Sequence, residues 1–203
     1  MDKDQEVRLY KKSLRLEYFT VGYNVFEGLA SIAAGIIAGS IALVGFGLDS
    51  FIESLSGSVL IWRLRQHSDD DEKERNLEEK AIRFVAYSFF VLAVYVAYEA
   101  LKKLYLREMP EGSLVGIIIA SVSIVIMPIL ADQKRQTGEK IGSRALVADS
   151  KETLVCTFLS ATLLFGLLLN YFLGWWWADP AASLVIVGFL IKEGRELFKG
   201  EEE

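Results

Sequence analysis

Two pairs of side chains with metal-binding chemistry occur at the same spacing in two separate apolar stretches. Asp49 and Glu53 lie four residues apart in one stretch, and Glu152 and Cys156 lie four residues apart in the other. On a helix this spacing puts both members of a pair on one face. Two such pairs on facing helices would offer four ligands, the number of a tetrahedral zinc site. We therefore predict a metal site made of Asp49, Glu53, Glu152 and Cys156.

The cost of burying these groups supports a role beyond packing, although structural alternatives remain. A charged side chain in the middle of a membrane costs about a few kcal/mol or more, and such groups usually line a bundle interior or an ion path. Asp49 and Glu53 also repel each other, and a divalent cation would relieve that repulsion. The alternative for Asp49, Glu53 or Glu152 is a role as a structural hydrogen-bond partner. Cys156 could equally be a small buried hydrophobe.

Other polar residues near these pairs are secondary candidates. Asn24 and Glu27 lie in the first apolar stretch, and Asp149 precedes Glu152 by three residues, so these three could support the site or line the path to it. Asp179 comes directly before a proline and is expected to cap the helix that it begins. His67, the single histidine, falls in a charged segment and is expected to be a loop residue.

Composition indicates a membrane protein. The chain has 203 residues, of which 52% are hydrophobic, a net charge of −5 and a mean hydropathy of +0.32. These values are typical of a polytopic protein with short loops, and no basic patch predicts binding to nucleic acid. With one cysteine, the chain can form no internal disulfide. It contains no P-loop, GxSxG, HExxH or CxxC motif, so we do not expect an enzyme.

The apolar stretches predict an all-α, polytopic membrane protein built as a bundle of six transmembrane helices. Residues 1–15 are a charged cytoplasmic lead-in, 16–198 form the transmembrane domain, and 199–203 are an acidic tail, with no soluble domain expected after the sixth span. Segments 65–80 and 131–144 are predicted to be polar loops. The predicted spans are residues 16–38, 41–64, 81–104, 113–130, 145–169 and 178–191.

The distribution of basic residues predicts the orientation. With six spans, eighteen Lys and Arg residues fall on the side of the two termini and three on the opposite side. Because basic residues concentrate in cytoplasmic loops, both termini are predicted to be cytoplasmic. We expect the protein to lie in the plasma (inner) membrane.

Three segments carry a resemblance to a known family. They are GSIALVGFGLDSFIES in the second span, GSRALVADSKETLVC leading into the fifth, and WWWADPAASLVIVGFLIKEG at the sixth. In these motifs, their order and the six-span layout, the chain resembles the cation diffusion facilitator family of metal transporters. Its layout, with no soluble domain expected, is similar to the branch that includes the transmembrane protein 163 group.

The resemblance implies a function and a ligand set. Members of the family exchange a divalent cation, commonly zinc, for protons by alternating access, and they form homodimers. Their metal site lies between the second and fifth spans, where the matching positions of this chain are Asp49, Glu53, Glu152 and Cys156. The inferred site has no histidine, and Cys156 stands where the family has a carboxylate, which favours softer ions.

Two functions are compatible with these observations. The first is a secondary transporter that exports a divalent transition metal from the cytoplasm, with zinc as the first candidate and iron, manganese, cadmium and cobalt as alternatives. It would have no tightly bound cofactor, and its partners would be the lipid bilayer, the metal ion, protons and a second copy of the chain. The second is a membrane protein that binds metal in a sensory or structural role without transporting it.

Overall fold

The structure is a computed structural model that describes residues 3–65, 71–108 and 110–199. These residues form six α-helices and contain no strand, which confirms the predicted all-α class. His67 and the last residues of the acidic tail, 200–203, lie outside the described part of the chain. The helices are α1 (Lys3–Ala38), α2 (Ile41–Arg65), α3 (Asp71–Leu106), α4 (Leu114–Ile141), α5 (Arg144–Leu173) and α6 (Ala178–Lys199).

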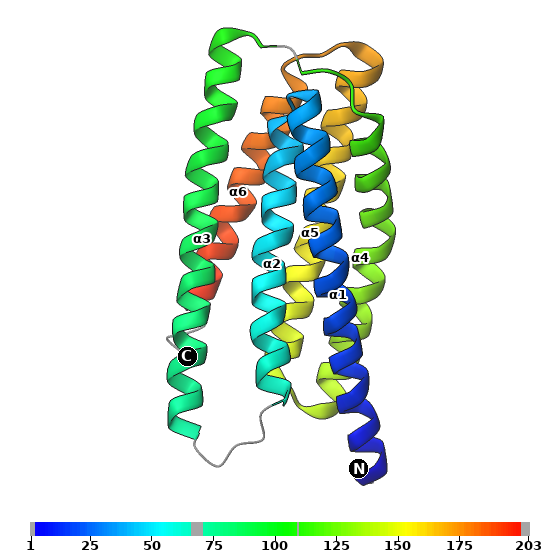
Figure 1. Cartoon of the computed structure of the whole chain (residues 1–203), viewed down its shortest axis with the longest axis vertical. Coiled ribbons are helices and arrows are strands. Elements are labelled where there is room, and N and C mark those ends of the chain that lie inside the picture. Colours follow the sequence, from blue (N-terminus) through cyan, green and yellow to red (C-terminus); the bar gives the residue numbers. More distant parts are fainter. Residues whose placement is uncertain (1–2, 66–70, 109, 200–203) are drawn as a thin grey trace.

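The six helices form an antiparallel bundle in which each helix runs opposite to the one before it (Figure 1). Helices α1, α2, α4 and α5 form a four-helix group, and α3 and α6 pack together at one side of it (Figure 1). Helix α2 contacts α1, α3, α5 and α6, so it lies at the centre of the bundle. Different faces of α2 therefore contact different neighbouring helices.

Helices α1 and α2 cross with their backbones in close contact. A Cβ atom added to Gly28 on α1 would lie 2.9 Å from the carbonyl oxygen of Gly47 on α2, and the reverse distance is also 2.9 Å. Only glycine allows this approach, as at other helix pairs that pack through small residues. The crossing brings the polar residues just before Gly28 next to those just after Gly47.

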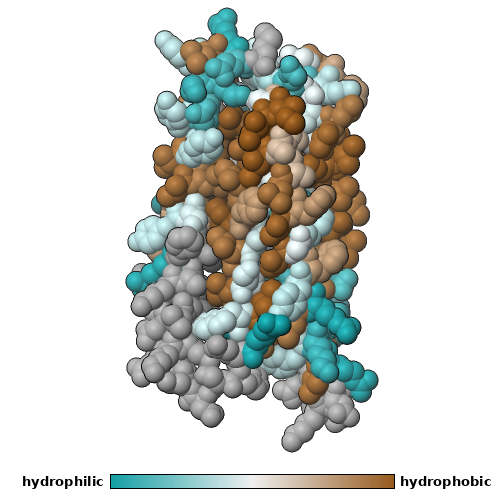
Figure 2. Space-filling view, in the orientation of Figure 1, coloured by the Kyte–Doolittle hydropathy of each residue, from teal (hydrophilic) through white to brown (hydrophobic). Residues whose placement is uncertain are grey.

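The surface of the bundle is apolar along most of its length. Figure 2 shows a broad hydrophobic band across the middle of the molecule, with hydrophilic residues toward both ends. Large hydrophobic side chains on this outer surface, such as Ile37 and Val94, are more than two-thirds exposed. A surface of this kind needs lipid around it, because soluble monomers rarely expose an apolar patch so large.

Four helical segments are long and apolar enough to cross a membrane, judged by length and composition over the described residues: Val7–Ala38, Ile41–Arg65, Leu114–Ile141 and Ala145–Leu173. The chain is therefore an integral, multi-pass membrane protein. Helices α3 and α6 do not meet the same criterion, although they run alongside the others (Figure 1). Their crossing of the membrane stays a prediction.

Several helices extend beyond the predicted spans. The predicted loop 131–144 is helical as far as Ile141, and α6 continues to Lys199 instead of ending at residue 191. The charged segment 65–80 is helical from Asp71 onward, and α1 begins at Lys3, within the predicted lead-in. The loop predictions for 71–80 and 131–141 were wrong, because hydropathy detects only the apolar part of a helix. Lys, Glu, Gln and Arg are good helix formers and continue a helix into water.

The role predicted for Asp179 was also wrong. Helix α6 begins at Ala178, so Asp179 already lies in its first turn. Its carboxylate accepts hydrogen bonds from the backbone N–H of Ile41, at 3.0 Å, and from the hydroxyl of Ser40. Asp179 thus caps the first turn of α2, where backbone N–H groups lack partners within the helix. This contact fixes the start of α6 beside the start of α2.

Candidate metal centre

Three of the predicted metal-binding side chains meet inside the bundle. Asp49 and Glu53 on α2 and Cys156 on α5 each offer one ligand atom, and these atoms all lie within 4.8 Å of one another. Asp49 is 2% exposed, Cys156 is fully buried and Glu53 is partly buried. Helices α2 and α5 pack against each other, so the two predicted pairs do lie on facing helices. We call Asp49, Glu53 and Cys156 the three-ligand cluster.

The donor set of the three-ligand cluster suits a divalent transition metal. Two carboxylate oxygens and one thiolate sulfur combine hard and soft ligands, a set compatible with zinc and related ions. If both carboxylates were charged without a cation, their removal from water would cost about several kcal/mol each. A bound divalent ion would offset that cost. A fourth tetrahedral position would remain for another ligand or water.

Glu152 lies beside the three-ligand cluster and is not a member of it. Its Oε2 atom accepts a hydrogen bond of 3.0 Å from Ser56 Oγ on α2, one turn beyond Glu53. Glu152 nevertheless lines a small cavity together with Asp49 and Glu53. In this conformation Glu152 is therefore near the cluster, and its role as the fourth metal ligand stays a prediction.

Asn24 on α1 touches the cluster directly. Its Nδ2 atom donates a hydrogen bond of 3.0 Å to Oε2 of Glu53. Its carbonyl oxygen Oδ1 is buried and has no hydrogen-bond partner among the described residues. Asn24 thus orients Glu53 and leaves one neutral oxygen close to the cluster.

Glu27, one turn further along α1, is held by hydroxyl groups. Its carboxylate accepts hydrogen bonds from Tyr23 at 3.1 Å, from Ser50 on α2 at 3.0 Å and from Ser123 on α4. Glu27 is 2% exposed. With three donors from three helices, it joins α1, α2 and α4 behind the site. Its oxygens are not part of the three-ligand cluster.

Asp149 is bound to a lysine instead of the cluster. Lys134 on α4 places its ammonium 2.5 Å from Asp149 Oδ2 and 3.2 Å from Oε2 of Glu17 on α1. The same ammonium donates to Thr153, one turn beyond Asp149, at 3.3 Å. We call Glu17, Lys134 and Asp149 the buried ion triad.

Sequence reasoning missed Glu17 and Lys134. Lys134 was assigned to a loop, whereas it lies inside α4 and is almost fully buried. A signal was present, because Ser123, Met127 and Lys134 recur at helical spacing and form one buried stripe of α4. Continuing that stripe past residue 130 would have predicted that Lys134 lies inside the bundle.

Glu193 on α6 was missed for a similar reason. It lines the same cavity as Asp49, Glu53 and Glu152. The predicted sixth span ended at residue 191, so Glu193 fell just outside it and was not considered. The structure extends α6 past it and buries it.

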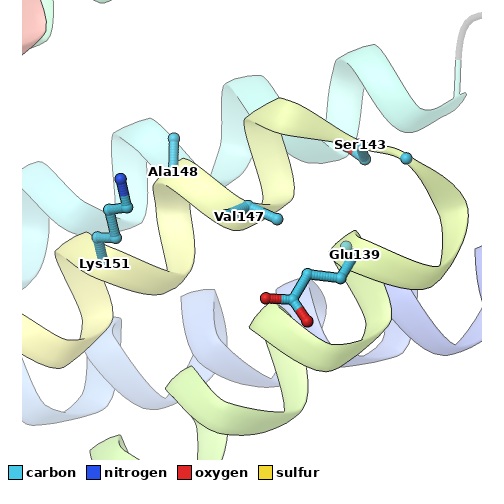
Figure 3. Close-up of a pocket in the computed structure, with 7 residues that line it drawn as sticks. Glu139, Ser143, Val147, Ala148 and Lys151 are labelled. Carbon is cyan, nitrogen blue, oxygen red and sulfur yellow. The ribbon is translucent and has the colours of Figure 1, made fainter.

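The chain also has a wider pocket, at the turn between α4 and α5. It is lined by Gly138, Glu139, Gly142, Ser143, Val147, Ala148 and Lys151 and shares no residue with the three-ligand cluster. In Figure 3 the Glu139 carboxylate points into the space between the two helices, while Lys151 points away from it. With a single carboxylate directed inward, this pocket offers no comparable set of metal ligands.

The chain matches the cation efflux transmembrane domain over residues 19–200. It is 22% identical over 197 residues to transmembrane protein 163 of Xenopus laevis, covering 96% of this chain and 69% of that protein. It is 23% identical over 171 residues to the cation-efflux pump FieF of Shewanella oneidensis, covering 82% of this chain and 57% of that protein.

A further relative is the cadmium, cobalt and zinc/H(+)-K(+) antiporter of Bacillus velezensis, which is 23% identical over 197 residues and covered over 61% of its length. The chain thus spans 57–69% of the length of these curated relatives. The match to the family domain extends over most of the chain and includes both helices of the three-ligand cluster. This protein therefore belongs to the cation efflux transmembrane domain family.

Proposed function

We propose that this protein is a secondary transporter that exports a divalent transition-metal cation, with zinc as the first candidate, from the cytoplasm. The observation that carries the proposal is the three-ligand cluster, in which ligand atoms from α2 and α5 lie within 4.8 Å of one another. Membership of the cation efflux family supports export. The name of one relative, an antiporter of cadmium, cobalt and zinc, supports this class of ion.

The proposed cycle uses competition between the metal ion and protons. Ligands must lose their protons to bind a metal, so metal binding and proton release are linked. A cluster open to the cytoplasm would bind the ion, and the same cluster open to a more acidic opposite side would exchange it for protons. Each opening would correspond to a different packing of the helices around the site.

Further parts of the proposal concern the setting. Both termini would lie on the cytoplasmic side of the plasma (inner) membrane, in agreement with the excess of Lys and Arg on that side. The transporting unit would be a homodimer. No catalytic step or tightly bound cofactor is proposed, and Glu152 is proposed as the fourth ligand once Ser56 releases it.

The test is zinc flux into proteoliposomes with an imposed pH gradient, followed with a fluorescent zinc indicator. Asp49→Ala should abolish saturable flux, because it removes the most deeply buried carboxylate of the cluster. Asp132→Ala is the matched control, since this carboxylate is exposed on α4 and should leave flux unchanged.

Flux in Asp49→Ala equal to that of the unmodified protein would overturn the proposed site. Saturable zinc binding without flux under any pH gradient would instead favour the sensory alternative.

A further inference from the structure

Glu193 is buried with an unused ligand atom. The residue is 8% exposed, and its Oε1 atom has no hydrogen-bond partner among the described residues. It lines the small cavity that Asp49, Glu53 and Glu152 also line. A buried carboxylate oxygen without a donor is costly, and native structures usually provide a partner for such an atom. A cation in the cavity would be that partner.

The docking of α6 on α2 places Glu193 at a definite level of the bundle. Asp179 contacts the first residue of α2, and the two helices run in the same direction from that contact (Figure 1). Glu193 follows fourteen residues later, which corresponds to about 21 Å along a helix. This distance brings it level with the part of α2 that follows Glu53.

Glu152 reaches the same level from α5. Its carboxylate is hydrogen-bonded to Ser56, which lies one turn after Glu53. The cavity that contains both glutamates has about 10 Å³ open to the centre of a water-sized sphere, so it has room for about one water or ion. No basic residue is among its lining residues, so no side chain there neutralises the two carboxylates.

We propose that Glu152 and Glu193 form a second position for a divalent cation, next to the three-ligand cluster and toward the later residues of α2. The inference rests on the proposed transport function, because the second position would be a stop for the transported ion on its path to or from the cluster. The charged donors of this position are carboxylates, whereas the cluster includes a thiolate. The second position should therefore tolerate harder ions, such as Mn²⁺, better than the cluster does.

The test is the number of Cd²⁺ ions bound per chain, measured by equilibrium dialysis of the purified full-length protein against cadmium chloride. Glu193→Gln lacks one charged ligand group of the second position. It should therefore bind one Cd²⁺ fewer than the unmodified protein, or bind the second ion at least about tenfold more weakly. Glu152→Gln should also lose the second ion, and it should weaken the first ion as well, because Glu152 is the proposed fourth ligand of the cluster. Glu196→Gln is the matched control, because Glu196 lies three residues away on α6 and is exposed beside Lys192.

The ultraviolet absorption of cadmium bound to thiolate separates the two sites, because Cys156 is the only cysteine. In Glu193→Gln this absorption should persist, which would show a folded protein with an intact cluster. Should Glu193→Gln fail to fold, Glu193→Asp keeps the charge, shortens the reach and should weaken only the second ion.

Equal numbers of bound Cd²⁺ with equal affinities in the unmodified protein and Glu193→Gln would overturn the second position. That result would leave the proposed function intact as long as Asp49→Ala abolished the thiolate absorption and the flux. Loss of the second ion in Glu193→Gln, together with unchanged flux in Asp49→Ala, would instead overturn the proposed function alone.

Discussion

The ammonium of Lys134 on α4 lies 3.2 Å from the carboxylate of Glu17 on α1, and both side chains are almost fully buried. Asp149 on α5 binds the same ammonium, and a Cβ atom added to Gly57 on α2 would lie 3.4 Å from Oε2 of Glu17. The buried ion triad thus joins α1, α4 and α5 where α2 also passes. It forms a charged layer next to the layer that contains Glu152, one turn further along α5.

Replacing Lys134 with methionine should strongly destabilise the protein. The change leaves two buried carboxylates without a positive partner, and breaking a buried ion pair in this way typically costs about 3–5 kcal/mol. The measurement is thermal unfolding of the purified protein in detergent. Lys140→Met, at an exposed position of the same helix, is the matched control and should leave the unfolding temperature unchanged.

Neutralising the whole triad should restore much of that loss. The triple variant Glu17→Gln, Lys134→Met, Asp149→Asn removes all three charges together, and buried ion groups replaced as a set are often nearly neutral in effect. An unfolding temperature of Lys134→Met equal to that of the unmodified protein would show that the triad does not stabilise the bundle.

Changing Cys156 to serine should alter ion preference more than overall fold. The hydroxyl is nearly the same size but is a harder and weaker ligand, so affinity for Cd²⁺ should fall at least about tenfold while affinity for Mn²⁺ changes less. Equilibrium dialysis with each ion separately measures both values. The cadmium–thiolate absorption of the unmodified protein must disappear in the variant. An unchanged ratio of the two affinities would mean that Cys156 only fills space.

Metal binding should release protons. Any ligand of the cluster that carries a proton in the empty protein must lose it when Cd²⁺ binds, so release on the order of one proton per ion is expected. Affinity for Cd²⁺ should accordingly rise as pH rises and fall as pH falls. Calorimetric titrations in buffers with different ionisation enthalpies measure the number of protons released. Identical binding heats in all buffers would argue against exchange of metal for protons at this cluster.

Replacing Asp179 with alanine should loosen α2 from α6. The variant removes the acceptor for the N–H of Ile41 and for the hydroxyl of Ser40, and loss of a helix cap typically costs about 0.5–2 kcal/mol. Thermal unfolding in detergent measures the loss. Asp179→Asn, which keeps one acceptor oxygen, should lose less than Asp179→Ala, and Glu111→Ala at an exposed position near the same end of the bundle serves as control. Equal unfolding temperatures of Asp179→Ala, Asp179→Asn and Glu111→Ala would contradict the capping role.

The class of fold and the approximate number of helices follow from the pattern of apolar residues. Each predicted span lies largely inside an observed helix, because the main-chain groups of a membrane segment must be paired within that segment. The ends were harder to predict. Helices α4 and α6 end at Ile141 and Lys199, well beyond the predicted spans, because the mostly charged and polar residues before those ends give little hydropathy signal.

The three-ligand cluster was predictable because each of its helices carries its ligands at fixed spacing. Asp49 and Glu53 share a face of α2 wherever that helix packs, and Cys156 follows from the same reasoning on α5. Glu193 and Lys134 were not found, since both lie beyond the predicted ends of their spans. Glu193 and Lys134 are buried because the neighbouring helices extend alongside these parts of α6 and α4.

The sequence by itself determined that this is a helical membrane protein and which side chains share a helix face, because 3.6 residues per turn fix those relationships locally. Only the tertiary structure decided which faces meet. It put Cys156 against Asp49 and Glu53, held Glu152 on Ser56, and paired Asp149 with Lys134 instead of the cluster. The rotation and crossing of two helices depend on how both surfaces pack, and neither surface alone specifies that geometry.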